Sequence, residues 1–294
     1  REWGRAQARA VETQGQGSSF HPVRTKAWRR AMAQARRITF ITAWSGVGKT
    51  TTGDYLGSYA GLYHVDGDDD MRKPHIPKCA AATDGLVKSF RDYWFKDVGA
   101  PPELWHPYHQ MLCDRVRAAA AEHDDIVVSM SVYRREVRDF IRGQLGSGVH
   151  FLKLECDVDV VVEGALDRLT SFLALSGKTL QEYWSSPQLS GVTFRERYGE
   201  FDLQCFRRMQ LETYLAGMEP FAEDERDFTV VDVSSRDAAA FDRVGAALGL
   251  PARTCEVDMQ MLGELQKARW SKLNELQKAA AAAEEASAEE GAGS

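Results

Sequence analysis

The chain has 294 residues, of which 44% are hydrophobic and 27% charged, a composition that excludes disordered and fibrous proteins. No uncharged apolar run approaches the roughly 18 residues of a membrane span. The five cysteines form no Cys-x-x-Cys pair, which excludes a disulfide framework and a thiolate zinc site. The net charge is −6, but residues 1–37 carry nine Arg or Lys against two Glu, so the rest of the chain is strongly acidic. An acidic body argues against nucleic acid as a partner.

Residues 1–36 form a basic N-terminal arm, which we interpret as a solvated leader, although contact with an anionic surface stays open. The chain begins at Arg1, and an Arg-rich arm with few acidic residues is typical of organelle-targeted precursors. We therefore expect an intracellular location: the cytoplasm, or an organelle lumen such as the stroma or matrix if the arm follows a removed leader.

From residue 37 to residue 250, short β-rich runs alternate with longer helical stretches. Strands are predicted at residues 38–43, 62–65, 126–130, 149–154 and 228–232. Helices are predicted between and after them at residues 49–60, 103–122, 133–145, 157–175, 202–217 and 236–248. Because strands alternate with helices, we predict an α/β fold with a five-stranded parallel sheet and helices on both faces.

Two regions interrupt this alternation, residues 71–102 and 176–199. Loops of such length inside a compact domain are usually lids or binding segments. We therefore expect a binding region at about 66–108 and a lid at about 174–200.

The chain after Pro251 has a different pattern. A Leu-x-Glu-Leu-Gln-Lys-Ala motif at residues 262–268 recurs at 273–279, so both copies lie on nearly one face of a helix. The pattern predicts an appended amphipathic helix within 251–294 that ends in a frayed acidic tail. This helix is expected to dock on the domain or on a partner, either another protein or a second copy of the chain.

The most specific motif directly follows the first predicted strand and opens the first predicted helix. It has the P-loop pattern, with Ala43 where the first glycine usually stands. In such loops the backbone amides surround the phosphates of a nucleotide, the lysine reaches the β- and γ-phosphates, and the following hydroxyl binds Mg²⁺. The residues predicted to bind ATP and Mg²⁺ are Ser45, Gly46, Val47, Gly48, Lys49, Thr50 and Thr51.

Four aspartates, residues 66 and 68–70, follow the second predicted strand. Because this strand is predicted to neighbour the P-loop strand, its carboxyl end lies where ligands bind in open α/β folds. We predict that Asp66 supports Mg²⁺ and that Asp68 orients and deprotonates a substrate hydroxyl. Asp69 and Asp70 fit a solvated turn.

These motifs, with several later segments, resemble the gluconokinase family, relatives of shikimate kinase with an adenylate-kinase-like P-loop fold. The resemblance spans roughly residues 38–249. Its most specific parts are the P-loop, Asp66-Gly67-Asp68 and the stretch at residues 131–139, which stands where the family has Ser-Ala-Leu-Lys-x-x-Tyr-Arg-Asp. The resemblance implies ATP-dependent phosphorylation of a small acceptor, a gluconate-like sugar acid or a polyol, under a lid that closes over the phosphates.

Carried over by position, the resemblance implies further site residues. Arg138 is a candidate for the carboxylate of the acceptor, and Arg72, His75 and Arg134 stand at positions of acceptor motifs. Arg168, Arg195 and Arg197 are candidates to neutralise the transferring phosphoryl group. For Arg138 and the lid arginines, a plain surface or lid position is the open alternative.

This sequence departs from the family pattern mainly in the acceptor half. Met71-Arg72 replaces His-Pro, His75-Ile76-Pro77-Lys78-Cys79 replaces Asn-Ile-x-Lys-Met, and Arg134 replaces the lysine of Ser-Ala-Leu-Lys. Two alternatives therefore stay open beside a carbohydrate-type kinase. One is a P-loop domain kept as a nucleotide-binding scaffold in a larger assembly, and the other is a nucleotide or nucleoside kinase.

Overall fold

A computed structural model describes residues 37–69, 102–146, 148–175, 177–186, 192–212, 218–269, 271 and 275. All of these residues belong to one compact unit. The predicted N-terminal arm, Arg72, His75 and the acidic tail lie outside the described residues. None of the described helices is both long and apolar enough to cross a membrane.

The centre of the fold is a five-stranded, all-parallel sheet, which confirms the predicted fold class. The strands follow the spatial order β2-β3-β1-β4-β5. Their bounds are β1 Arg37–Thr42, β2 Tyr63–Asp66, β3 Asp125–Ser129, β4 Val149–Glu155 and β5 Phe228–Asp232. β1 and β3 are buried along nearly their whole length, as expected for strands covered on both faces.

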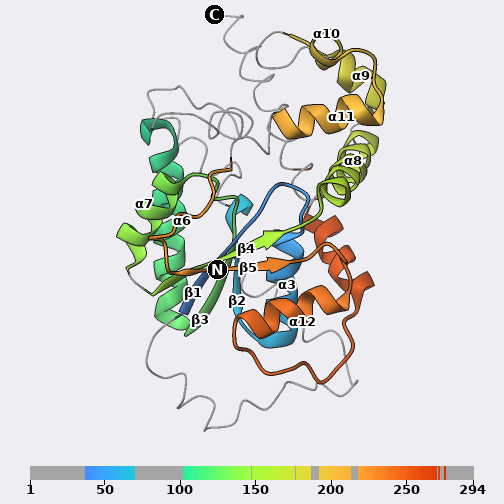
Figure 1. Cartoon of the computed structure of the whole chain (residues 1–294). Helices are drawn as coiled ribbons and strands as arrows, with labels where there is room; N and C mark the ends of the chain where they lie inside the picture. The colour runs from blue at the N-terminus through green and yellow to red at the C-terminus, as the bar shows by residue number, and fades with distance from the viewer. Residues whose placement is uncertain are drawn as a thin grey trace, which may run out of the picture. The chain divides into compact units, whose positions relative to one another are not determined.

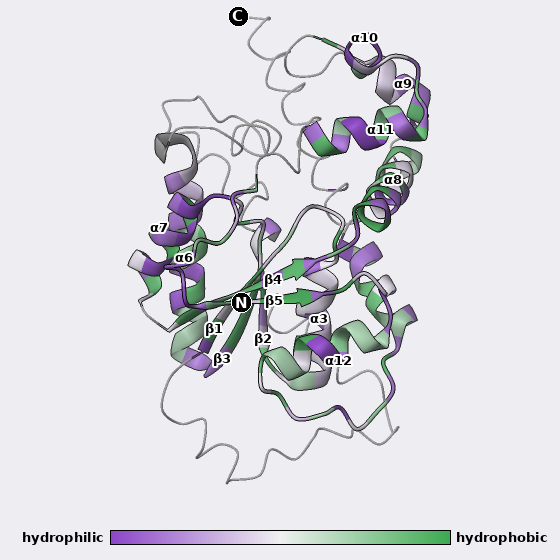
Figure 2. Cartoon of the chain, in the orientation of Figure 1, coloured by the Kyte–Doolittle hydropathy of each residue, from purple (hydrophilic) through white to green (hydrophobic). Residues whose placement is uncertain are grey.

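Helices cover both faces of this sheet (Figure 1). α6 (Pro102–Glu122) and α7 (Arg135–Leu145) pack on one face, where Trp105, Leu112 and Ile141 are buried against β1, β3 and β4. α3 (Lys49–Ala60) and α12 (Ala238–Ala247) pack on the other face, where Leu56 and Val244 join a second core. Figure 2 shows the apolar character of β4 and β5 and the polar surface of α7.

The segment predicted as a lid contains more regular structure than expected. After α8 (Val158–Leu175), the stretch predicted as a polar loop forms two short helices, α9 (Leu180–Ser185) and α10 (Phe194–Tyr198), before α11 (Leu203–Gln210). Each short helix begins with a complete capping box, Thr179 with Glu182 and Thr193 with Glu196. Together with residues of α8 and α11, the segment forms a separate apolar core around Trp184.

The appended helix is present at residues 259–269, and Leu262 is fully buried in the core that α3 and α12 share. Residues 259–269 therefore pack on the domain itself, which is one of the two docking alternatives predicted for the appended helix. The other predicted elements agree with the structure to within two residues at the bounds described. The helix predicted at 202–217 is seen as α11 followed by a π-helical turn at residues 211–212, and its predicted end at 213–217 lies outside the described residues.

Candidate functional site

The loop between β1 and α3 has the backbone conformation of a phosphate-binding turn. Gly46 and Gly48 have φ angles of 88° and 103°, in the left-handed region that disfavours side chains, and Gly48 is the N-cap of α3. Val47, between them, is buried in the core and anchors the loop. Among the described residues Arg236 is the only non-glycine residue with positive φ, so Ala43 replaces the usual glycine without strain. The N-terminus of α3 therefore offers backbone amides to an anion.

Lys49 folds over this loop. Its Nζ donates hydrogen bonds to the carbonyl oxygens of Ala43, at 2.9 Å, and Trp44, at 3.0 Å. Burial lowers the pKa of Lys49 to about 7; the charges of Asp68 and Asp66 oppose this decrease, and that of Arg168 adds to it. Three other predicted site residues, Asp66, Asp68 and Arg168, therefore interact electrostatically with the Lys49 ammonium.

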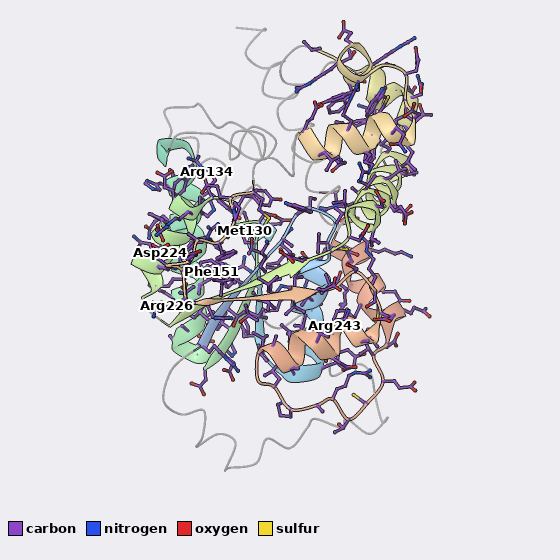
Figure 3. The ribbon with its side chains drawn as sticks, in the orientation of Figure 1. Met130, Arg134, Phe151, Asp224, Arg226 and Arg243 are labelled. Carbon is purple, nitrogen blue, oxygen red and sulfur yellow. The ribbon has the colours of Figure 1, made fainter. Side chains whose placement is uncertain are left out.

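Asp66 and Asp68 lie at the carboxyl end of β2, which continues into a short 3-10 turn, Gly67–Asp69. Asp66 is buried, and its Oδ1 accepts hydrogen bonds from the backbone N–H of Asp68, at 3.2 Å, and from Ser129 Oγ, at 3.4 Å. A Cβ on Gly67 would lie 2.7 Å from Met130 Sδ and 3.0 Å from the carbonyl oxygen of Ser129, so the turn favours glycine there. The glycine of Asp66-Gly67-Asp68 thus accommodates the close approach of Ser129 and Met130 at the end of β3 (Met130 is labelled in Figure 3).

The three arginines predicted near the phosphoryl group lie in different surroundings. Arg168, on α8, donates from Nη1 to Ser45 Oγ at 3.2 Å, so it lies at the P-loop. Arg195 forms an ion pair with Glu200, and Arg197 lies 3.7 Å from Glu212. The ion-pair partners described for Arg195 and Arg197 are therefore Glu200 and Glu212, and neither belongs to the P-loop.

Arg138, predicted to bind the acceptor carboxylate, is engaged elsewhere. Its guanidinium is fully buried and donates to both carboxylate oxygens of Glu225, at 2.7 and 2.8 Å. Further hydrogen bonds run to the carbonyl oxygens of Tyr133, Glu219 and Pro220, and the ring of Phe221 lies 4.2 Å from the guanidinium carbon. Because its donors already have protein acceptors, we do not place Arg138 in the acceptor site.

Arg134 lies at the N-cap of α7 and donates to Glu136 at 3.0 Å. In Figure 3 it lies on the α6 and α7 side of the sheet, as does Asp224, which pairs with Arg135. The remaining predicted acceptor residues, Arg72 and His75, lie outside the described residues.

The structure adds an arginine that sequence reasoning missed. Arg236, in the turn after β5, donates from Nη2 to the carbonyl oxygen of Gly46 at 3.2 Å. A Cβ on Gly164 of α8 would lie 2.4 Å from this guanidinium, so Arg236 packs directly over that glycine. The sequence signal was faint, since a glycine inside a predicted helix marks a close approach without naming the partner.

A polar network beside Asp66 was also missed. His64 of β2 binds Asp54 Oδ1 through Nδ1 and Ser129 Oγ through Nε2, both at 2.9 Å. Gly53 makes room for the imidazole, because a Cβ there would lie 2.2 Å from His64 Nε2. Arg269, from the C-terminal helix, pairs with Asp54 and lies 3.5 Å from Asp66 Oδ2. No motif joins residues this far apart in the chain, so only the fold could reveal the network.

No family model and no curated protein sequence matches this chain. Solved structures do match over 73% of the chain. A gluconokinase from Sinorhizobium meliloti 1021 is 19% identical with a TM-score of 0.39 over 96% of its length. A sugar kinase from Janibacter sp. HTCC2649 is 20% identical with a TM-score of 0.43 over 95% of its length. A shikimate kinase from Bacteroides thetaiotaomicron is 11% identical with a TM-score of 0.36 over 99% of its length.

Proposed function

We propose that this protein is an ATP-dependent phosphotransferase that moves the γ-phosphoryl group of ATP to a hydroxyl of a small polar metabolite. The main support is the convergence around Lys49 of Asp66, Asp68 and Arg168 at a glycine turn that opens α3. Two carboxylates and two basic side chains beside amides suited to phosphate are the groups that phosphoryl transfer needs.

The residues present suit ATP and Mg²⁺. The left-handed glycines turn the backbone of the loop, which also carries Lys49 and the hydroxyl side chains Ser45 and Thr50. Thr50 and Asp66 supply oxygen donors, the ligand type that Mg²⁺ prefers, and would hold the ion together with the nucleotide. Bound there, Mg²⁺ would neutralise charge that develops on the phosphate oxygens.

In the proposed reaction, Asp68 is the general base. Its carboxylate accepts the proton of the acceptor hydroxyl as that oxygen attacks the γ-phosphorus. A new P–O bond forms, the bond from the γ-phosphorus to the bridging oxygen breaks, and ADP leaves. Lys49 and Arg168 stabilise the negative charge on the transferring group. Asp68 lies close enough to Lys49 for its charge to oppose the lowered lysine pKa.

The acceptor class rests on the sequence resemblance, which favours a gluconate-like sugar acid or a polyol. Arg72, His75 and Arg134 remain the proposed acceptor contacts. Arg195 and Arg197 would reach the phosphates only through a movement of the lid segment, because their described partners are Glu200 and Glu212.

The test measures ATP consumption by the purified full chain with Mg²⁺ against a panel of sugar acids, polyols and nucleosides. We expect one acceptor class to stimulate turnover and Lys49→Ala to abolish it. Asp68→Asn should lower kcat about 10²- to 10⁴-fold while sparing ATP binding. The exposed Asp114→Asn serves as the matched control. Undiminished turnover in Asp68→Asn would refute the assigned base, and stimulation only by nucleosides would replace the acceptor class.

The engagement of Arg138 with Glu225 favours a second candidate, a nucleotide-binding scaffold. A chain that no longer binds an acidic acceptor could keep its P-loop while its former acceptor residues become structural. This candidate predicts ATP binding that depends on Lys49 without turnover on any panel member. Substrate-dependent turnover that Lys49→Ala abolishes would exclude it.

A further inference from the structure

The C-terminal helix is seated on the nucleotide-binding half of the domain. Its N-terminus is capped by Asp258, whose Oδ1 accepts from the N–H of Met261 at 2.8 Å. The N–H of Asp258 in turn donates to Tyr59 Oη of α3 at 2.7 Å. Leu262 is fully buried one turn further along. These contacts fix the beginning of the helix and direct its later turns along α3.

Arg269 lies at the other end of this helix, and its guanidinium lies beside Asp54 and Asp66 at the candidate site. Its guanidinium grips Asp54 with both terminal nitrogens, Nη1 to Oδ2 at 2.8 Å and Nη2 to Oδ1 at 2.5 Å. Asp54 is 5% exposed and belongs to α3, the helix that the P-loop opens. A bidentate pair with a buried carboxylate fixes the guanidinium in place.

The same guanidinium also faces the carboxylate proposed to support Mg²⁺. Arg269 Nη1 lies 3.5 Å from Asp66 Oδ2, while Oδ1 of Asp66 accepts from the Asp68 N–H and Ser129 Oγ. A cation supported by Asp66 would meet the positive charge of Arg269 on the Oδ2 side. Two cations that share one buried carboxylate repel each other strongly, because the surrounding protein screens less than water.

We infer that Arg269 is an intramolecular competitor of Mg²⁺ at Asp66, so that the C-terminal helix regulates metal loading of the site. The inference rests on the proposed function, since it takes Asp66 as a metal-supporting group. It assigns a regulatory role to a segment that lies beyond the stretch resembling kinases. Anything that draws the last turn of the helix away, such as a partner that binds it, would raise the affinity of the site for Mg²⁺.

Thermodynamic linkage makes this inference reciprocal. If Arg269 weakens Mg²⁺ binding by some factor, bound Mg²⁺ must weaken the contact of Arg269 by the same factor. Because Leu262 and Asp258 hold the start of the helix independently, the loosening should be confined to residues 266–269.

The experiment compares the affinity of the full chain for ADP, by isothermal titration calorimetry, with Mg²⁺ and with EDTA. The ratio of the two affinities measures the contribution of Mg²⁺. We expect Arg269→Gln to raise this ratio about tenfold, within the usual range of site-to-site coupling. Arg269→Lys keeps the charge and should stay near the wild-type ratio. The matched control is Lys267→Gln, an exposed cation two residues earlier on the same helix.

Hydrogen exchange gives a readout independent of affinity and shows whether each variant is folded. MgADP should accelerate amide exchange of residues 266–269 in the wild type and leave residues 259–263 protected. A ratio that is unchanged or lower in Arg269→Gln overturns the inference. If Mg²⁺ contributes nothing to ADP affinity in either the wild type or Arg269→Gln, the proposed role of Asp66 in supporting Mg²⁺ is overturned as well. A raised ratio without phosphorylation of any acceptor supports the inference and counts against the proposed function alone.

Discussion

Two basic side chains of this molecule, the fully buried Arg138 and the half-buried Lys49, lie beside carboxylates but differ in how their charge is satisfied. Arg138 has Glu225 on two of its donors and backbone carbonyls on the others. Lys49 has only two carbonyl oxygens as described hydrogen-bond partners, and burial lowers its pKa to about 7. The first charge is fully paired by the protein, whereas the second would gain stability from an anion.

Glu225, the carboxylate that pairs with Arg138, is also fully satisfied by the protein. Burial by itself would raise the pKa of Glu225, but hydrogen bonds from Arg138, the Ala222 N–H and Arg142 hold it at about 2. Glu225 therefore stays ionised throughout the physiological range. A pair arranged this way stabilises the fold, while an ammonium group whose charge is disfavoured by burial is stabilised when an anion binds beside it.

The largest effect that we predict tests whether Arg138 is structural, and it is an effect on the stability of the fold. Arg138→Met should lower the free energy of unfolding by about 3–5 kcal/mol, because it leaves Glu225 buried without its main partner. Chemical denaturation measures the change, and nucleotide affinity of the folded fraction should be retained. Arg135→Met, three residues earlier and paired with Asp224 at the surface, is the control and should change stability little. If a folded Arg138→Met protein lost its affinity for nucleotide, the Arg138–Glu225 pair would belong to the nucleotide-binding site.

The contrast also explains what could be predicted from the sequence. The sheet, its covering helices and the P-loop follow from local signals, because hydrophobic period, glycine spacing and strand order act over short stretches. Asp66 and Asp68 could be placed because the ends of parallel strands meet at one edge. The role of Arg138 could not be predicted, because its partner Glu225 lies 87 residues further along the chain and no sequence motif links the two residues.

The contacts of Arg236 and Arg269 could not be predicted for the same reason, because their partners Gly46 and Asp54 lie 190 and 215 residues away in the chain. The helices α9 and α10 were a different kind of miss. Thr179 with Glu182 and Thr193 with Glu196 are capping-box spellings visible in the sequence, but each helix is too short to show a hydrophobic period.

The next effect concerns the proton balance of Lys49. The folded protein loses this proton near pH 7, whereas the unfolded chain keeps it to about 10.5, so stability without nucleotide should rise with pH between these values. Phosphate binding favours the ammonium form. At pH 8 we therefore expect ATP binding to take up nearly one proton, and at pH 6 almost none. Calorimetry in buffers of different ionisation enthalpy measures the uptake, and an undiminished uptake in Lys49→Met would assign it to another group.

The smallest effect tests which neighbours set this titration. Arg168 lies at Ser45 of the P-loop, and its charge adds to the decrease in the pKa of Lys49. Arg168→Ala should therefore raise that pKa by less than about one unit, because burial is the larger cause and stays in place. The midpoint of proton uptake on ATP binding would move to higher pH by the same amount. Arg207→Ala, on α11 and paired with Asp159 of α8, should leave the midpoint unchanged. A midpoint that moved down in Arg168→Ala would mean that Arg168 stabilises the charged lysine through a shared anion, and the Lys49 site would then resemble the fully paired Arg138 site.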